Sequence, residues 1–79
     1  MKNTLQILFF GQLATLTGCA KADVVRPANT DELQRLLYET YPRLREAKYL
    51  VTLDRKVVKE NTTVGEDAEI ALLPPFSGG

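Results

Sequence analysis

The chain has 79 residues, of which 44% are hydrophobic, and this length and composition fit one small folded domain, which we expect to span residues 1–79. Ten basic and ten acidic side chains give a formal net charge of zero, which argues against a nucleic-acid binder that neutralises phosphates. The sequence has no histidine and one cysteine, Cys19, so it lacks the commonest general base and metal ligand and cannot form an internal disulfide.

The first third of the sequence predicts a β-hairpin. Residues 4–10 form a predicted strand whose alternation places one set of side chains in the core, namely Leu5, Ile7 and Phe9. Residues 12–16 predict a short helical turn, which Gly18 stops. Residues 22–26 predict a second strand, which pairs with the first and ends at Pro27.

An amphipathic helix is predicted next, with Thr30 as its N-cap. Asp31 and Glu32 follow in the first turn, where negative charge suits the positive end of the helix dipole. The stripe that then recurs at helical spacing consists of Leu33, Leu36, Leu37, Thr40 and Tyr41. Pro42 marks the end of the helix, because the residue before a proline disfavours helical geometry.

Three further strands are predicted after the helix. Residues 49–53 alternate as a strand, residues 54–56 form a turn, and residues 57–58 form a short strand. A polar, turn-rich stretch over residues 61–68 leads to the last strand, residues 69–73, which two prolines end. The order of two strands, a helix and three strands predicts an α+β fold of the β-grasp type. In it, one main helix packs on one face of a mixed sheet, and the first strand lies parallel to a strand after the helix.

The most informative segment is the C-terminal tail, about residues 74–79. Pro74 and Pro75 lack amide hydrogens, so they end the sheet ladder and stiffen the exit from the last strand. Gly78 and Gly79 have no side chains, so a flexible tail that ends in them fits a narrow slot and leaves its terminal carboxyl carbon open to attack. A carboxylate is a poor electrophile and the sequence has no phosphate-binding loop, so a partner must activate the tail. A frayed terminus without function is the alternative interpretation.

A second candidate site lies on the face of the sheet opposite the helix. Leu8 and Phe10 belong to that face of the first strand, and Leu73 precedes the tail. One helix covers one face of a sheet, so these apolar side chains are expected to be exposed and to form an interface. The alternative is that Phe10 packs under residues 12–16.

Other groups of reactive or charged side chains have simpler interpretations. Cys19 lies close to Lys21 and is a candidate persulfide or thioester site, but a small loop residue is the favoured interpretation. A solvated face is favoured over an anion site for the basic cluster Arg43, Arg45 and Lys48. Turn charges are favoured over a metal site for the acidic cluster Glu66, Asp67 and Glu69.

Four segments carry a resemblance to a known family: residues 7–13 (ILFFGQL), Tyr41-Pro42, residues 65–70 (GEDAEI) and residues 73–79 (LPPFSGG). They resemble the small subunit of molybdopterin synthase, a MoaD-type sulfur carrier with a ubiquitin-like β-grasp fold. The ending, two prolines followed by two glycines after a two-residue gap, is the specific part of this resemblance. The remaining segments are compatible with it over essentially the whole chain.

The resemblance implies a chemical role for the tail. An adenylating enzyme of the MoeB type, similar to ubiquitin-activating enzymes, uses ATP to adenylate Gly79, and a sulfur donor system converts the adenylate into a thiocarboxylate. The tail, with Gly78, then inserts into the large, MoaE-type subunit of a heterotetrameric synthase. There the sulfur enters the dithiolene of molybdopterin, built on cyclic pyranopterin monophosphate, during molybdenum cofactor biosynthesis. The catalytic residues belong to the large subunit, so the isolated chain is expected to be non-catalytic and to bind no cofactor or metal.

The resemblance also implies a partner-binding face that consists of Phe10, Val57, Leu73, Pro74, Pro75 and Phe76. The residue pattern points to Phe10 and Leu73 independently, whereas Val57 follows from the resemblance alone. Family members often carry Asn-Gly or Asp-Gly in the hairpin after the third strand. This chain has Asp54-Arg55-Lys56 there, which leaves the type of turn open.

Two alternatives to this function remain. One is the sister carrier for thiamine thiazole, which also ends in Gly-Gly but usually lacks the two prolines. The other is a ubiquitin-like modifier or binding domain. The sequence has no apolar run of about 20 residues and no signal-peptide-like start, so we expect a cytoplasmic protein with no membrane or nucleic-acid partner.

Overall fold

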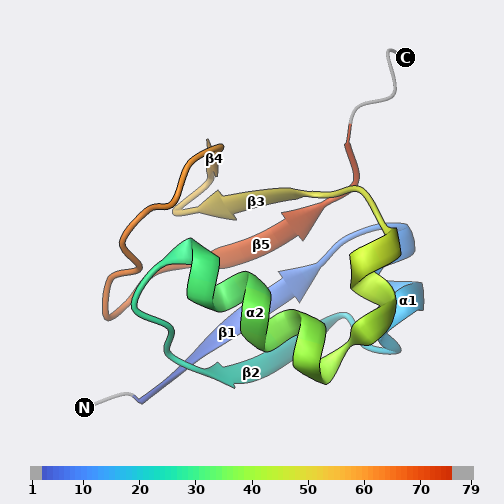
Figure 1. Ribbon diagram of the computed structural model, residues 1–79, viewed down its shortest axis with the longest axis horizontal. Coiled ribbons are helices and arrows are strands. Elements are labelled where there is room, and N and C mark those ends of the chain that lie inside the picture. The colour runs from blue at the N-terminus through green and yellow to red at the C-terminus, as the bar shows by residue number, and fades with distance from the viewer. Residues whose placement is uncertain (1–2, 76–79) are drawn as a thin grey trace.

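Five strands form one sheet in the computed structural model, which describes residues 3–75 (Figure 1). The strands are β1 (Thr4–Phe9), β2 (Lys21–Val25), β3 (Leu50–Leu53), β4 (Lys56–Val58) and β5 (Ile70–Leu73). They lie in the order β2-β1-β5-β3-β4, with β1 parallel to β5 and every other neighbouring pair antiparallel. The predicted mixed sheet, with the first strand parallel to a strand after the main helix, is therefore confirmed.

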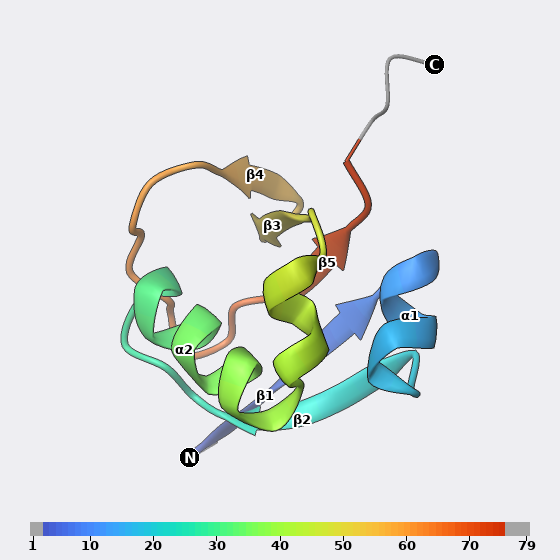
Figure 2. The same cartoon turned by 45° about the vertical axis from the view of Figure 1, so that its right-hand side comes forward.

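The helices are grouped on one side of this sheet (Figures 1 and 2). The main helix, α2 (Thr30–Thr40), crosses the sheet, and the short helix α1 (Gln12–Thr17) connects β1 to β2. A 3-10 helix, η1 (Pro42–Glu46), follows α2 directly. Gly18 ends α1 in the left-handed conformation, as its place in the sequence predicts. No helix within residues 3–75 is long and apolar enough to cross a membrane.

The centre of the core is built from the two parallel strands. Ile7 pairs with Ile70 and Phe9 pairs with Leu72, and all four side chains are buried. Leu5, further back on β1, is buried as well, so the predicted alternation of this strand is confirmed. The side chains that complete the core come from α1, α2, η1, β3 and the loop before β5, and they are Leu13, Leu33, Leu37, Leu44, Val51, Leu53 and Val64.

The N-cap of α2 is Asn29, and the prediction of Thr30 is wrong. The side chain of Asn29 accepts a hydrogen bond from the backbone N–H of Glu32 at 2.9 Å. Thr30 is the first helical residue, and its buried hydroxyl accepts the backbone N–H of Thr62 at 2.9 Å. Asn61, on the same loop, accepts a hydrogen bond from the backbone N–H of Asp31 through its Oδ1 at 2.9 Å. The loop before β5 thus gives Thr30 a partner that its neighbours in sequence do not reveal.

The apolar stripe of α2 is confirmed at its centre and fails at its end. Leu33 and Leu37 are fully buried, and Leu36 and Tyr41 are half-buried. Thr40 is exposed, and its hydroxyl donates to the backbone carbonyl of Leu36 at 3.0 Å. The reason is that α2 ends at Thr40 and the chain turns there, so Thr40 never faces the sheet.

Two buried segments were not expected from the sequence. Pro42 does end α2, but it also begins η1, in which Leu44 is fully buried. The stretch of residues 61–68 contains no named helix or strand, yet Val64 within it is 3% exposed and belongs to the core. A single apolar residue in a polar stretch has no periodicity, so its burial depends on where the loop passes.

The hairpin between β3 and β4 has a two-residue turn, Asp54-Arg55, because Leu53 pairs with Lys56. The predicted three-residue turn is therefore one residue too long. Asp54 has φ of 51° and Arg55 has φ of 70°, and positive φ at both central residues marks a type I′ turn. This is the turn for which Asp-Gly is favoured, so Arg55 occupies a position that glycine usually takes.

Candidate partner-binding face

The face of the sheet that the helices leave uncovered carries an apolar patch. Leu8 on β1 lies opposite Ala71 on β5, and Ala71 lies opposite Thr52 on β3. Thr52 in turn lies opposite Val57 on β4. We call the set Leu8, Phe10, Thr52, Val57, Ala71 and Leu73 the open face. Because paired residues of a sheet share a face, the strand register alone brings four of these six side chains into one row.

Phe10 is the most prominent side chain of the open face. It is 46% exposed and lies outside the core cluster, so the alternative of Phe10 packed under residues 12–16 is wrong. Its backbone N–H donates to the carbonyl of Leu72 at 3.1 Å, which continues the β1–β5 pairing one residue past the end of β1. Val57 is 45% exposed, close to the value of Phe10. Their role in binding stays a prediction, and both side chains are open to solvent.

A shallow hollow of about 410 Å³ lies in the open face. Its apolar lining comes from Leu8, Phe10, Ala71 and Leu73, and its polar lining comes from Thr52, Arg55 and Glu69. Arg55 and Glu69 form an ion pair, with 3.4 Å between Nε and Oε1. The hollow therefore combines an apolar floor with one charged pair at its rim, which is the usual make-up of a protein-binding surface.

The tail begins at the edge of the open face. Leu73 is the last residue of β5, and Pro74 and Pro75 follow it half-buried. Gly11, at φ 58°, allows Pro74 to approach closely, because a Cβ at Gly11 would lie 2.7 Å from Cγ of the proline. The contact between Gly11 and Pro74 holds the start of the tail beside Phe10. Phe76, Ser77, Gly78 and Gly79, the predicted reactive end, lie outside the described residues.

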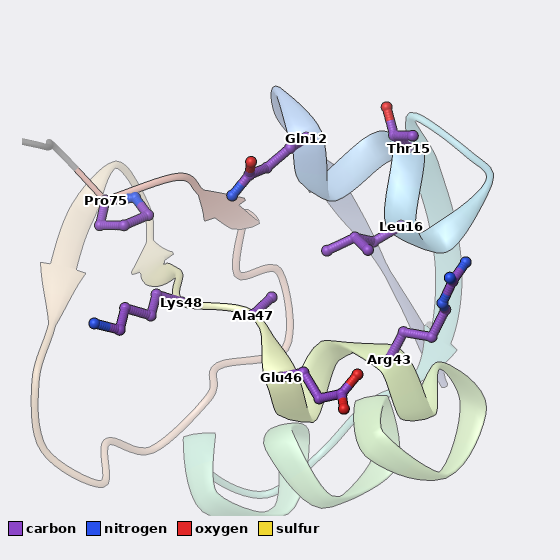
Figure 3. Close-up of a pocket in the computed structure, with 8 residues that line it drawn as sticks. All are labelled: Gln12, Thr15, Leu16, Arg43, Glu46, Ala47, Lys48 and Pro75. Carbon is purple, nitrogen blue, oxygen red and sulfur yellow. The ribbon is translucent and has the colours of Figure 1, made fainter.

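A larger hollow, of about 640 Å³, lies on the other side of the tail base (Figure 3). Leu16 of α1 and Ala47 after η1 point into it from opposite walls, and Pro75 borders it. Arg43 and Lys48 also line it, and neither forms an ion pair with another residue in the range 3–75. The sequence did not reveal this hollow, because its walls come from segments about thirty residues apart that only the fold brings together.

Cys19 sits in the loop between α1 and β2 and is half-buried. Its Sγ lies 3.7 Å from the hydroxyl of Tyr41 and 3.7 Å from that of Thr17. The hydrogen bond with Cys19, followed by burial, raises the pKa of the Tyr41 phenol above its usual value. These contacts fit the interpretation of Cys19 as a packed loop residue. In the part of the chain that the structure describes, no three acidic or sulfur side chains are grouped to hold a metal ion.

A five-stranded mixed sheet with one main helix across one face, whose last strand leads into the tail base beside an apolar face, defines a ubiquitin-like β-grasp protein. The chain belongs to the ThiS family, whose model matches residues 7–79. It is 36% identical to the molybdopterin synthase sulfur carrier subunit of Caenorhabditis briggsae, over 96% of this chain and 98% of that protein. It is 31% identical to the protein of the same name from Caenorhabditis elegans, with the same coverage.

Solved structures share the fold at lower identity. SAMP1 from Haloferax volcanii superimposes with a TM-score of 0.78 at 20% identity, over 96% of this chain and 99% of that one. A protein–protein complex of subunits 1 and 2 of the molybdopterin-converting factor from Helicobacter pylori contains a chain that superimposes with a TM-score of 0.71. The identity to that chain is 22%, and the match covers 96% of this chain and 99% of that one. These likenesses confirm the β-grasp architecture.

Proposed function

We propose that this chain is the sulfur-carrier small subunit of a molybdopterin synthase. The observation that carries the proposal is the position of the tail base, since Leu73 belongs to the open face and Pro74 directly follows it. A protein that covers the open face therefore also meets the start of the tail. The two Caenorhabditis relatives named as sulfur carrier subunits of molybdopterin synthase support the same function.

The chemistry of the proposal belongs to the carboxyl group of Gly79. In the activation step, this carboxylate attacks the α-phosphate of ATP on an adenylating enzyme, which releases pyrophosphate and forms an acyl-adenylate. Hydrosulfide supplied by a sulfur donor system then attacks the acyl carbon, the bond to AMP breaks, and the chain is left with a terminal thiocarboxylate. Neither step needs a catalytic side chain from this chain, whose contribution is a terminus that fits a narrow channel and a body that binds its partner.

The partner in the second stage is the large subunit of the synthase. The open face binds this subunit through Phe10, Val57 and Leu73, and Pro74 and Pro75 restrict the orientations of the tail before it enters. A tail that is stiff at its base loses less conformational entropy on insertion than a fully free one. The large subunit supplies the groups that act on the pterin, and the synthase is a heterotetramer in the cytoplasm.

Deletion of Gly79 tests this function. The truncated chain should fold, bind the large subunit with unchanged affinity and compete with the intact chain, but it should support no molybdopterin formation. The assay contains the adenylating enzyme, ATP, a sulfur source and the large subunit, with the intact chain as its control. Normal rates with the truncated chain would rule out the carrier function.

The intact mass of the chain from cells that make molybdopterin separates the alternatives. Exchange of one oxygen atom for sulfur supports a sulfur carrier, and a series of larger conjugates supports a protein modifier. A carrier for thiamine thiazole would show the same exchange of oxygen for sulfur. It would fail to support molybdopterin formation when combined with the large subunit.

A further inference from the structure

The β3–β4 turn places an arginine where the backbone favours glycine. Arg55 has φ of 70°, in the left-handed region in which a Cβ crowds the backbone. Asp54, at φ 51°, tolerates the first position of the turn far better, because aspartate is common there. Uncommon backbone geometry at a residue with a long side chain is a reason to ask what that side chain does.

The turn is held firmly against the residue that precedes β5. The backbone N–H of Asp54 donates to the carbonyl of Glu69 at 2.8 Å, and the backbone N–H of Glu69 donates to Oδ1 of Asp54 at 3.0 Å. Arg55 adds a hydrogen bond from Nε to Oε1 of Glu69 at 3.4 Å. Its side chain is 87% exposed, so this ion pair adds little to stability and does not offset the cost of the left-handed backbone.

The side chain of Arg55 lies at the rim of the hollow in the open face. It borders the same cavity as Leu8, Phe10 and Leu73. A partner that covers these apolar side chains also removes water from the guanidinium group. Among residues 3–75, Glu69 is the acidic side chain that pairs with it, through Nε alone, so the terminal nitrogens then need acceptors from the partner.

We propose that Arg55 is a specificity-determining residue, whose terminal guanidinium nitrogens bind a carboxylate of the large subunit when that subunit covers the open face. The proposal rests on the proposed function, because it assumes that partner. A carboxylate fits best, since its two oxygens match the planar fork of an arginine. The ion pair with Glu69 leaves the guanidinium beside the hollow, with its terminal nitrogens available to the partner's carboxylate.

Three substitutions at this position separate binding from folding. Arg55→Gly removes the steric strain of the left-handed backbone at this position and should raise the melting temperature by about 4 °C. It should nevertheless weaken binding to the large subunit about tenfold or more. Arg55→Ala should weaken binding equally without raising the melting temperature, and Arg55→Lys should bind with intermediate affinity because it keeps the charge and loses the fork.

The measurement is calorimetric titration of each variant with the large subunit at low and high salt, beside thermal unfolding of each variant alone. Arg35→Ala is the matched control, because Arg35 is an exposed arginine paired with Glu39 on α2, and its affinity should equal that of the wild type. Wild-type affinity for Arg55→Gly would overturn the role of Arg55 and leave the proposed function intact. A wild-type chain that does not bind the large subunit at all would overturn both.

Discussion

Tyr38 and Tyr49 show how tertiary contacts set the chemistry of single residues. The hydroxyl of Tyr49 donates to that of Tyr38 at 2.8 Å, and the guanidinium of Arg45 lies 5.4 Å from the centre of the Tyr38 ring. Burial, followed by this hydrogen bond, raises the pKa of Tyr49 far above its usual value of 10.0. Arg45 is exposed, in keeping with the solvated face expected for the basic cluster, and it also packs over the Tyr38 ring.

This pKa shift predicts a loss of stability in alkaline solution. The folded chain holds the phenolic proton of Tyr49 more tightly than the unfolded chain does. The resulting stabilisation is complete below pH 10 and is lost as the pH rises through the folded pKa. Tyr49→Phe should lower the free energy of unfolding by about 1 kcal/mol at pH 8, because the hydrogen bond to Tyr38 is lost. The difference in free energy of unfolding between the wild type and Tyr49→Phe should become smaller above about pH 10. Urea unfolding from pH 8 to pH 11 measures both effects, and a constant difference across that range would contradict the prediction.

At the scale of elements, η1 is the segment that joins the helical layer together. It begins at Pro42, where the sequence predicts only the end of a helix, and it lies next to both α1 and α2. Leu44 is its buried residue, whereas Arg43 and Arg45 are exposed. A 3-10 helix of five residues is too short to produce a recurring hydrophobic pattern in the sequence. Only one of its residues, Leu44, is buried and anchors it to the core.

Replacement of Leu44 tests the importance of this anchor. Leu44→Ala should lower the free energy of unfolding by about 2–5 kcal/mol, because the side chain is fully buried and its removal leaves a cavity. Arg43→Ala, the neighbouring exposed position, should change it by less than about 0.5 kcal/mol. Urea unfolding followed by circular dichroism measures both variants. Equal stability of the two variants would show that η1 contributes little to the core.

At the scale of the whole molecule, the parallel pairing of β1 with β5 decides where the candidate site lies. It brings residues near the two ends of the sequence together at the centre of the sheet, so that Phe10 and the base of the tail are neighbours. The helices occupy the opposite face (Figure 2). On the open face, Phe10 and Val57 are exposed, Leu8 and Leu73 are half-buried, and Ala71 is buried between its neighbouring strands. One arrangement therefore supplies both a surface for a partner and the direction in which the tail leaves it.

A charge in the open face should weaken partner binding and leave the fold intact. Phe10→Asp should reduce the affinity for the large subunit by about 2 kcal/mol or more, roughly 30-fold, because an aromatic anchor is lost and a charge is buried. Val25→Asp is the matched control, since Val25 is 68% exposed on the edge strand β2 and pairs with Thr4, at the opposite end of β1 from Phe10. Calorimetry measures binding, and circular dichroism checks the fold. Loss of folding in Phe10→Asp, or equal affinity of the two variants, would contradict the assignment of the open face.

The sequence by itself determined the features that depend on near neighbours. Alternation placed Leu5, Ile7 and Phe9 in the core, and the order of elements predicted the mixed sheet with one main helix, which the structure confirms. The sequence also predicted the exposure of Phe10, which the structure confirms. The first strand is apolar on both faces, and one layer of helices covers only one face of a sheet. These features follow from the side-chain period of a strand or helix, which can be recognised from neighbouring residues in the sequence.

Tertiary structure decided what depends on segments far apart in the chain. Asn29 rather than Thr30 caps α2, because the loop that contains Thr62 occupies the hydroxyl of Thr30. Hydrogen bonds between Asp54 and Glu69 hold the β3–β4 turn in its left-handed geometry, so the turn forms with Arg55 at the position that usually carries glycine. Caps, tight turns and surface hollows are completed by partners that arrive from elsewhere in the chain. The energies of these features depend on distances between segments that are far apart in the sequence. Those distances are defined only once the whole chain has folded.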